Sequence, residues 1–144
     1  MAYDPKLSWD GVAAALSGPG LGPALDDGFL YVYDDSDDVP AHADDDVGDC
    51  VLLAVLGFGD PAFGADVEGV MTAEAITSED SALDTGTASF GRYVAADETV
   101  IFQGLCGTSA SDFILSTEGE GGPLDIAEGM TVACASAILR MVRE

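Results

Sequence analysis

The spacing of apolar and polar residues changes once along the chain, near residue 28. Before that point, in the segment SWDGVAAALS, apolar residues recur at the three- and four-residue spacing of a helix. Ser8 stands where a helix N-cap belongs, and Asp10 falls in the first turn, where a negative charge is favourable. The pattern predicts a short helix over residues 9–16. Its apolar positions are Trp9, Val12, Ala13 and Leu16.

The stretch that follows, GPGLGPALDDG, contains too many Gly and Pro residues for a regular element, so we expect a connector there. The sequence thus predicts two parts. Residues 1–27 should form an N-terminal arm with one short helix, and residues 28–144 should form the body of a single domain.

From residue 28 onward the periodicity becomes two, and β-branched and aromatic residues are frequent, as in strands. Turn-rich pieces such as DTGT, AADE and EGEGGPLD separate the segments with this pattern. The segments are FLYVYD, CVLLAVLGF, VEGVMTAEAIT, ASFGRYVA, TVIFQGLC, DFILST and TVACASAILRMV. We therefore predict an all-β body, a β-sandwich or jelly roll of about seven to eight short antiparallel strands.

The last segment, residues 131–142, also has the Ala, Leu, Met and Arg content of a helix. The turn-like sequence AEGMT precedes it, and we favour a strand. In a regular strand, alternate residues share a face. One face would then carry Val132, Cys134, Ser136 and Ile138, and the other Thr131, Ala133, Ala135, Ala137 and Leu139.

Charge narrows the range of partners. The 144 residues include 27 acidic and 4 basic side chains, which gives a formal net charge of -23. Binding to nucleic acid requires cations opposite the phosphates, so we expect no contact with DNA or RNA, and none with an anionic membrane. The chain also lacks an apolar run of the length that a transmembrane helix needs. Salt or a basic partner would relieve its self-repulsion.

The most acidic stretch, DDSDDVPAHADDDVGD at residues 34–49, contains the only histidine of the chain, His42. A nucleophilic triad needs a histidine fixed beside a nucleophile, and nothing in this stretch suggests one. An EF-hand loop that began at Asp34 would require Gly where Val39 stands, and Pro40 follows it. We expect a mobile loop that faces solvent.

The remaining candidate chemistry is equally sparse. The three cysteines, Cys50, Cys106 and Cys134, are scattered in apolar stretches and are expected to be buried, reduced thiols. They cannot supply a zinc site with a single histidine. The segment GEGGPLD carries acid where a phosphate-binding loop needs a cation. We therefore predict no catalytic residues, no metal ligands, no cofactor and no small-molecule substrate, and we do not expect an enzyme.

Several stretches do form a recognisable series: YVYDDSDDVPAHADDD, LLAVLGFGDPAFGADVEGVMTAEAI, DTGTASFGRYV and GTSASDFILST. In this order and spacing they resemble a group of small structural proteins of tailed bacteriophages. The shared features include a P-A-x-A-D loop, an L-L-A-x-L strand, a D-P-A-F-G turn and a G-T-A strand that ends in an aromatic residue and Arg. The resemblance spans residues 31–117.

The resemblance implies a component of the virion, and head decoration or cement proteins often have a β-sandwich or jelly-roll fold of this size. Such a protein would bind the major capsid protein, assemble as a homo-oligomer on the capsid surface, and join the particle in the host cytoplasm. The N-terminal arm could then reach a neighbouring capsomer. We take Trp9 and Leu21 as the candidate contacts, because buried aromatic and aliphatic side chains dominate interfaces.

Two alternatives remain open at this stage. The protein could belong to the tail, as a component of the tube or a fibre. It could also be of another class, a small acidic enzyme or a module that binds a divalent cation through carboxylates of residues 34–49, with Asp44, Asp45 and Asp46 as the first candidates.

Overall fold

The computed structural model describes residues 5–18, 20–65, 67–108, 111–117 and 124–140. The helices are α1 (Trp9–Leu16) and α2 (Leu21–Ala24). The strands are β1 (Lys6–Leu7), β2 (Phe29–Asp34), β3 (Leu52–Phe58), β4 (Val70–Thr72), β5 (Ile76–Thr77), β6 (Gly86–Val94), β7 (Val100–Gly107), β8 (Phe113–Thr117), β9 (Asp125–Ile126) and β10 (Val132–Arg140). The predicted all-β fold with a short N-terminal helix is confirmed, and α1 has the predicted bounds.

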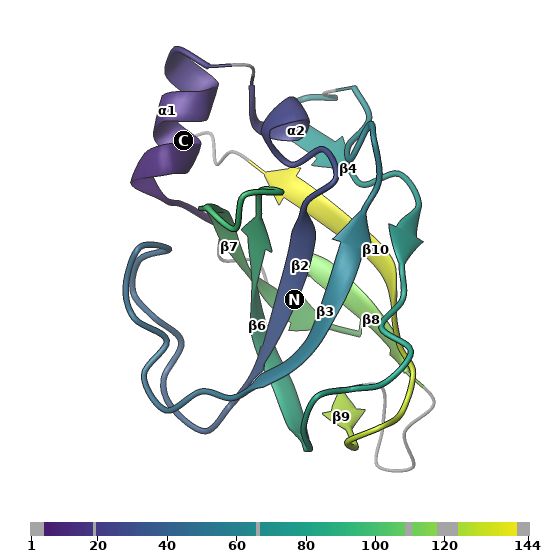
Figure 1. The fold of residues 1–144 in the computed structure, drawn as a ribbon. Helices are drawn as coiled ribbons and strands as arrows, with labels where there is room; N and C mark the ends of the chain where they lie inside the picture. Colours follow the sequence, from purple (N-terminus) through teal and green to yellow (C-terminus); the bar gives the residue numbers. More distant parts are fainter. Residues whose placement is uncertain (1–4, 19, 66, 109–110, 118–123, 141–144) are drawn as a thin grey trace.

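The strands form one sheet that curls into a half-barrel (Figure 1). Its order is β4-β10-β8-β7-β6-β2-β3-β5, while β1 pairs with β7 and β9 pairs with β6. The strands of the described residues pair antiparallel, except that β7 and β8 run parallel. The expectation of antiparallel pairing throughout was wrong at this one place.

The two edge strands explain how the sheet curls. The pattern predicts one strand in residues 67–77, but the chain forms β4 and β5 there, at opposite ends of the sheet. Only residues 73–75 separate them, so the two edges of the sheet must lie close together. Glu68 and Gly69 precede β4 with φ angles of 53° and 85°, and this left-handed turn ends the regular alternation.

The core fills the concave side of the half-barrel. Its centre is Tyr93 on β6, which is fully buried and whose ring centroid lies 4.9 Å from that of Phe102 and 5.6 Å from that of Phe58. The Tyr93 hydroxyl donates to the Ile138 carbonyl at 2.8 Å, so the buried polar group is satisfied. Burial raises the pKa of Tyr93 well above its ordinary value, and the phenol stays neutral.

A bulge in β10 corrects the predicted faces of the last strand. The register with β8 shifts between Cys134 and Ser136. Val132 therefore points into the core before the bulge, and Ala137 and Leu139 point into it afterwards. The predicted strand is present, but the strict alternation was wrong because the extra residue exchanges the two faces. Residues 141–142 of the predicted strand lie outside the described residues.

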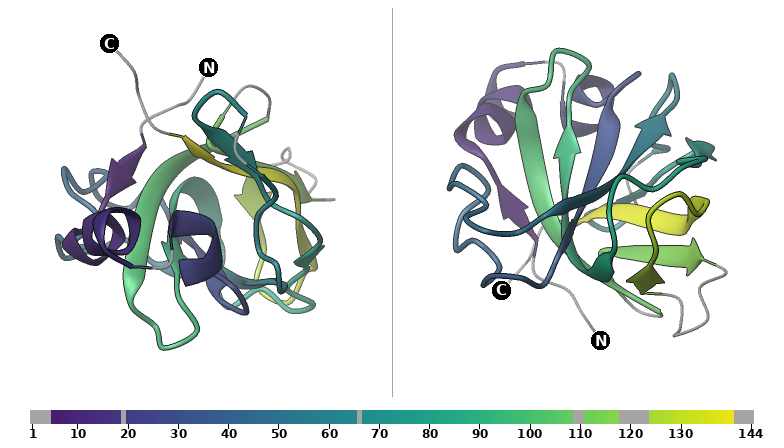
Figure 2. Two further views of the ribbon diagram at one scale, coloured as in Figure 1. Left: turned by 90° about the horizontal axis from the view of Figure 1, so that it is seen from above. Right: turned by 60° about the horizontal axis from the view of Figure 1, so that its bottom comes forward.

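The connector after α1 also differs from the prediction, because it contains the helical turn α2. Pro23 fits within the first turn of a helix, where its missing N–H is not needed. Gly22 packs so closely on the body that a Cβ there would lie 2.6 Å from Met71 Cε. Seen from above, α2 covers the open end of the half-barrel, and Leu25, which follows it, is fully buried (Figure 2).

Candidate functional site

Helix α1 packs on β7 through its smallest residues. Gly11 and Ala14 are its buried positions, and a Cβ on Gly11 would lie 2.1 Å from the carbonyl oxygen of Ile101. Ser8 fixes the start of the helix: its Oγ accepts the Gly11 N–H at 2.9 Å, and its own N–H donates to Ile101 O at 3.1 Å. The Ser8 hydroxyl also donates to the Val100 carbonyl. The helix is thus held tightly to the sheet.

The large apolar side chains of α1 consequently point away from the body. Trp9 is 78% exposed and Leu16 is 82% exposed. At about 100° per residue, Trp9, Val12, Ala13 and Leu16 share an arc of about 100°, opposite Gly11 and Ala14. The apolar face in the sequence is therefore the outer face of the helix. Figure 2 shows α1 on the outside of the half-barrel.

The acidic loop, residues 35–51 between β2 and β3, is fixed to the body by two buried side chains. Arg92 on β6 donates from one terminal nitrogen to the Asp45 carbonyl at 2.6 Å and from Nε to Gln103 Oε1 at 3.0 Å. Gln103 on β7 donates to the Pro40 carbonyl at 2.8 Å. Arg92 is 7% exposed and Gln103 is 1% exposed, so the loop covers both.

Two residues near the middle of the acidic loop face inward. Pro40 and Ala43 are buried, and Ala43 is completely inaccessible to solvent. At the start of the loop, the Asp34 carboxylate accepts the N–H of Val51 at 2.7 Å and the hydroxyl of Ser36 at 2.5 Å, which joins the two ends of the loop. The expected exposure to solvent therefore holds for the aspartates of residues 35–51, but not for the whole loop. The backbone packs on the sheet.

The two charged side chains that attach the acidic loop, Arg92 and Asp34, both have shifted pKa values. Burial lowers the pKa of the Arg92 guanidinium, while the neighbouring Tyr33 and the carboxylates of Asp45 and Asp44 act in the opposite direction. For Asp34, burial acts to raise the pKa, but the hydrogen bonds from Ser36 and Val51 outweigh it and hold the pKa below its ordinary value. Both groups serve the attachment of the loop.

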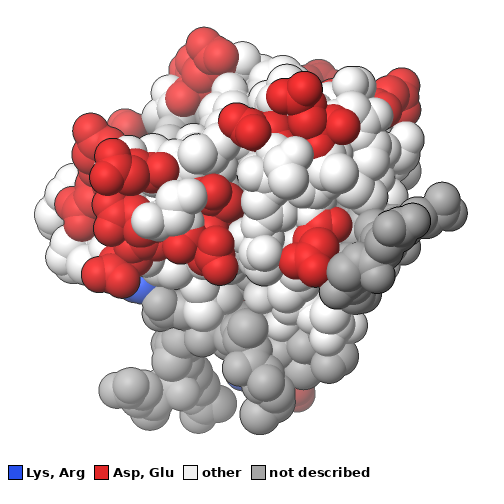
Figure 3. Space-filling view, turned by 90° about the horizontal axis from the view of Figure 1, so that it is seen from below, with Lys and Arg blue, Asp and Glu red and all other residues white. Residues whose placement is uncertain are grey.

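The outer part of the acidic loop carries a dense negative charge. On the face shown in Figure 3, acidic side chains crowd the side where this loop lies, and very little Lys or Arg surface is visible. The exposed acidic residues of the loop are Asp35, Asp37, Asp38, Asp44, Asp45, Asp46 and Asp49. A cation brought by a partner would find several carboxylates within one Debye length.

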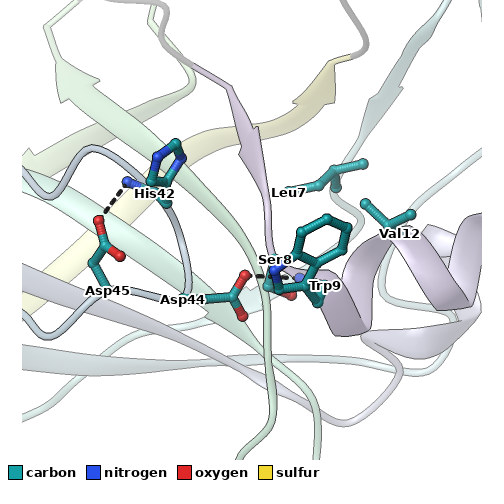
Figure 4. Close-up of a pocket in the computed structure, with 7 residues that line it drawn as sticks. All are labelled: Leu7, Ser8, Trp9, Val12, His42, Asp44 and Asp45. Carbon is teal, nitrogen blue, oxygen red and sulfur yellow. Dashed lines mark hydrogen bonds between the residues drawn. The ribbon is translucent and has the colours of Figure 1, made fainter.

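A cavity of about 390 Å³ separates the outer face of α1 from the acidic loop. Its lining residues are Leu7, Ser8, Trp9, Val12, His42, Asp44 and Asp45. Figure 4 shows Leu7, Trp9 and Val12 on one side and His42 with Asp45 on the other. Asp44 connects the two sides, because its Oδ2 accepts a hydrogen bond from the backbone N–H of Trp9 at 2.8 Å. The result is a groove with one apolar side and one acidic side.

The two predicted contact residues differ in their surroundings. Trp9 is exposed beside the groove, whereas Leu21 is partly buried and packs against the core. Sequence reasoning did not predict that Leu16 is exposed, and it did not predict the groove. The available signal was the small residues Gly11 and Ala14 opposite the Trp9 face, since a helix that packs closely on a sheet does so through small side chains.

Further features of the described residues concern metal ligands, cysteines and membrane spans. They contain no group of three or more His, Cys, Asp or Glu side chains that could hold a metal ion. The three cysteines are free thiols: Cys50 and Cys106 are buried and Cys134 is half-buried. Neither helix in the described part of the chain is long and apolar enough to span a membrane.

Comparison of the chain with protein-family models, with curated proteins and with solved structures gives no significant match. The functional interpretation therefore depends on the surface of α1, the groove and the acidic loop.

Proposed function

We propose that the protein is a structural component of a bacteriophage virion, a capsid decoration or cement protein that binds the shell of the major capsid protein and stabilises the head. The observation that carries the proposal is the orientation of α1, which exposes Trp9 and Leu16. Exposed aromatic and aliphatic side chains that are held on a rigid helix are suited to be the energetic centre of a protein interface.

A structural role also agrees with how the surface is built. The apolar face of α1 is pre-organised by the Ser8 and Gly11 contacts, so binding would require little ordering of the chain. A standard interface of roughly 1,600 Å², repeated in many copies on a symmetric shell, would stabilise the head without any chemical step. The series of motifs in residues 31–117 supports the same assignment.

Cosedimentation tests the proposal. The purified protein is mixed with capsid shells that were assembled without it, and the expected results are cosedimentation and a higher temperature of shell disruption. Mass spectrometry of separated heads and tails should detect the protein in heads. Recovery in tails alone would assign it to the tail tube or a fibre, and no binding to shells at any salt concentration would refute the proposal.

A further inference from the structure

The groove beside α1 has an apolar side and an acidic side, and this lining indicates which side chains a partner would place there. We infer that it binds a basic segment of the capsid partner, with an apolar side chain against Trp9 and Val12 and a Lys or Arg side chain at Asp44 and Asp45. This inference rests on the proposed function and extends it, because it specifies which part of a partner the protein contacts and with what chemistry.

The two sides of the groove require a partner segment with two kinds of side chain. Leu7, Trp9 and Val12 provide an apolar side, and Trp9 is the most exposed of them at 78%. Covering Trp9 removes a large apolar surface from water, which favours an aliphatic or aromatic side chain at that position. The cavity of about 390 Å³ lies at the lower end of the range of ligand sites.

The acidic side has unused hydrogen-bonding capacity. Asp44 Oδ2 accepts the backbone N–H of Trp9 at 2.8 Å, and Asp45 Oδ2 accepts the backbone N–H of His42 at 3.1 Å. An ionised carboxylate has about four acceptor sites, so both residues can still accept from a cationic side chain. Arg is the better fit, because its planar guanidinium can bind a carboxylate through two parallel hydrogen bonds.

Charge complementarity favours a different protein over a second copy of the chain as the occupant. A copy brings a net charge of -23 and only 4 basic residues among 144. Of these, Arg92 is buried beneath the acidic loop of its own chain. Like-charge repulsion would oppose such a contact, whereas a basic segment of a different protein would relieve it.

The single tryptophan provides a direct readout. The chain contains one Trp, and it borders the groove. Intrinsic fluorescence is therefore recorded while the protein is titrated with a short amidated peptide that alternates leucine and arginine. Two matched peptides carry glutamate in place of arginine, or serine in place of leucine. We expect a blue shift of the Trp9 emission with the first peptide only, with an affinity that falls as salt is added.

Two double variants with the same change in net charge separate the groove from general attraction. Asp44→Asn with Asp45→Asn neutralises the groove, and both new side chains can still accept the local backbone N–H groups. Asp35→Asn with Asp38→Asn removes the same charge from exposed positions of the acidic loop outside the groove. The first pair should weaken peptide binding about tenfold, and the second pair less than about twofold.

Several results would overturn the inference. One is equal weakening of peptide binding by the two variant pairs. Another is no shift of the Trp9 emission with the leucine and arginine peptide, even at low salt. A third is an emission shift that depends on the concentration of the protein alone, which would assign the groove to a second copy. Shell binding separates this inference from the proposed function. If wild type and Asp44→Asn/Asp45→Asn bind shells equally, the proposed function stands and this inference fails. If the peptide binds but shells do not, the proposed function fails, and with it the capsid as the partner, while the preference of the groove for a basic and apolar segment stands.

Discussion

The close contact of α1 with β7 makes Gly11 the most informative position for a stability experiment. In a solvent-exposed helix, Gly→Ala stabilises by about 1 kcal/mol because alanine has the higher helix propensity. Here the new Cβ would lie 2.1 Å from Ile101 O and 3.3 Å from Leu7 Cδ2. A carbon and a carbonyl oxygen need about 3.3 Å, so the helix must move outward by about 1 Å.

That displacement has a calculable cost. The Ser8 N–H would lose its 3.1 Å hydrogen bond to Ile101 O, and the Ser8 hydroxyl would lose the Val100 carbonyl. Two hydrogen bonds contribute about 2 kcal/mol, overpacking adds strain, and the propensity gain offsets about 1 kcal/mol. We expect Gly11→Ala to lower the free energy of unfolding by about 1–2 kcal/mol, with the opposite sign to a free helix.

Urea denaturation followed by circular dichroism measures this change, and hydrogen exchange of the Ser8 amide shows whether the helix has left the sheet. Ala15→Gly is the matched control, because Ala15 is exposed and the substitution should cost only the propensity difference of about 1 kcal/mol. If Gly11→Ala is as stable as the wild type or more so, with Ser8 still protected, the described packing of α1 is wrong.

Three further predictions concern the interior. Arg92→Met removes the donors that hold the acidic loop and should lower the free energy of unfolding by about 2–3 kcal/mol; an unchanged denaturation midpoint would contradict it. The pKa of Asp34 is lower in the folded protein than its unfolded value of about 3.9, so the ionised carboxylate stabilises the fold above that pH. This contribution is lost as the pH falls through the folded pKa, so the stability difference between wild type and Asp34→Asn should shrink in acid. A difference that does not depend on pH would refute this prediction. Burial raises the pKa of Cys106 to about 12 and that of Cys134 to about 11, so few of these thiols are ionised at pH 8. A disulfide reagent should modify the buried Cys106 only after unfolding and the half-buried Cys134 slowly in the native protein; rapid reaction of Cys106 in the native protein would disprove its burial.

Local sequence signals identified α1 and the longer strands, but they missed α2, the division into β4 and β5, and which face of α1 packs inward. Ser8, Asp10 and the apolar spacing define α1 because capping and periodicity act within a few residues. Which side of α1 packs inward depends on β7, where the Ile101 carbonyl leaves room for Gly11 alone. A periodic pattern identifies an apolar face but does not show whether the chain itself or a partner covers it.

The acidic loop illustrates the same limit over a longer distance. Its composition predicts exposed carboxylates, and these are exposed. Its attachment depends on Arg92 and on Gln103, which lies 63 residues from the Pro40 carbonyl that it binds. No local rule relates these positions, because the pairing of β6 with β7 places Arg92 opposite Gln103 and the loop then packs over both. The groove beside Trp9 depends on this attachment, and it could not be predicted from either segment alone.

The most direct test of the account compares shell binding by two double variants. Trp9→Ser with Leu16→Ser changes the outer face of α1, while Val67→Ser with Leu83→Ser changes the other large apolar side chains that are exposed among the described residues. Cosedimentation with shells assembled without the protein should be lost in the first variant and kept in the second. Equal binding by both variants, with the fold intact by circular dichroism, would contradict the assignment of α1 as the binding surface.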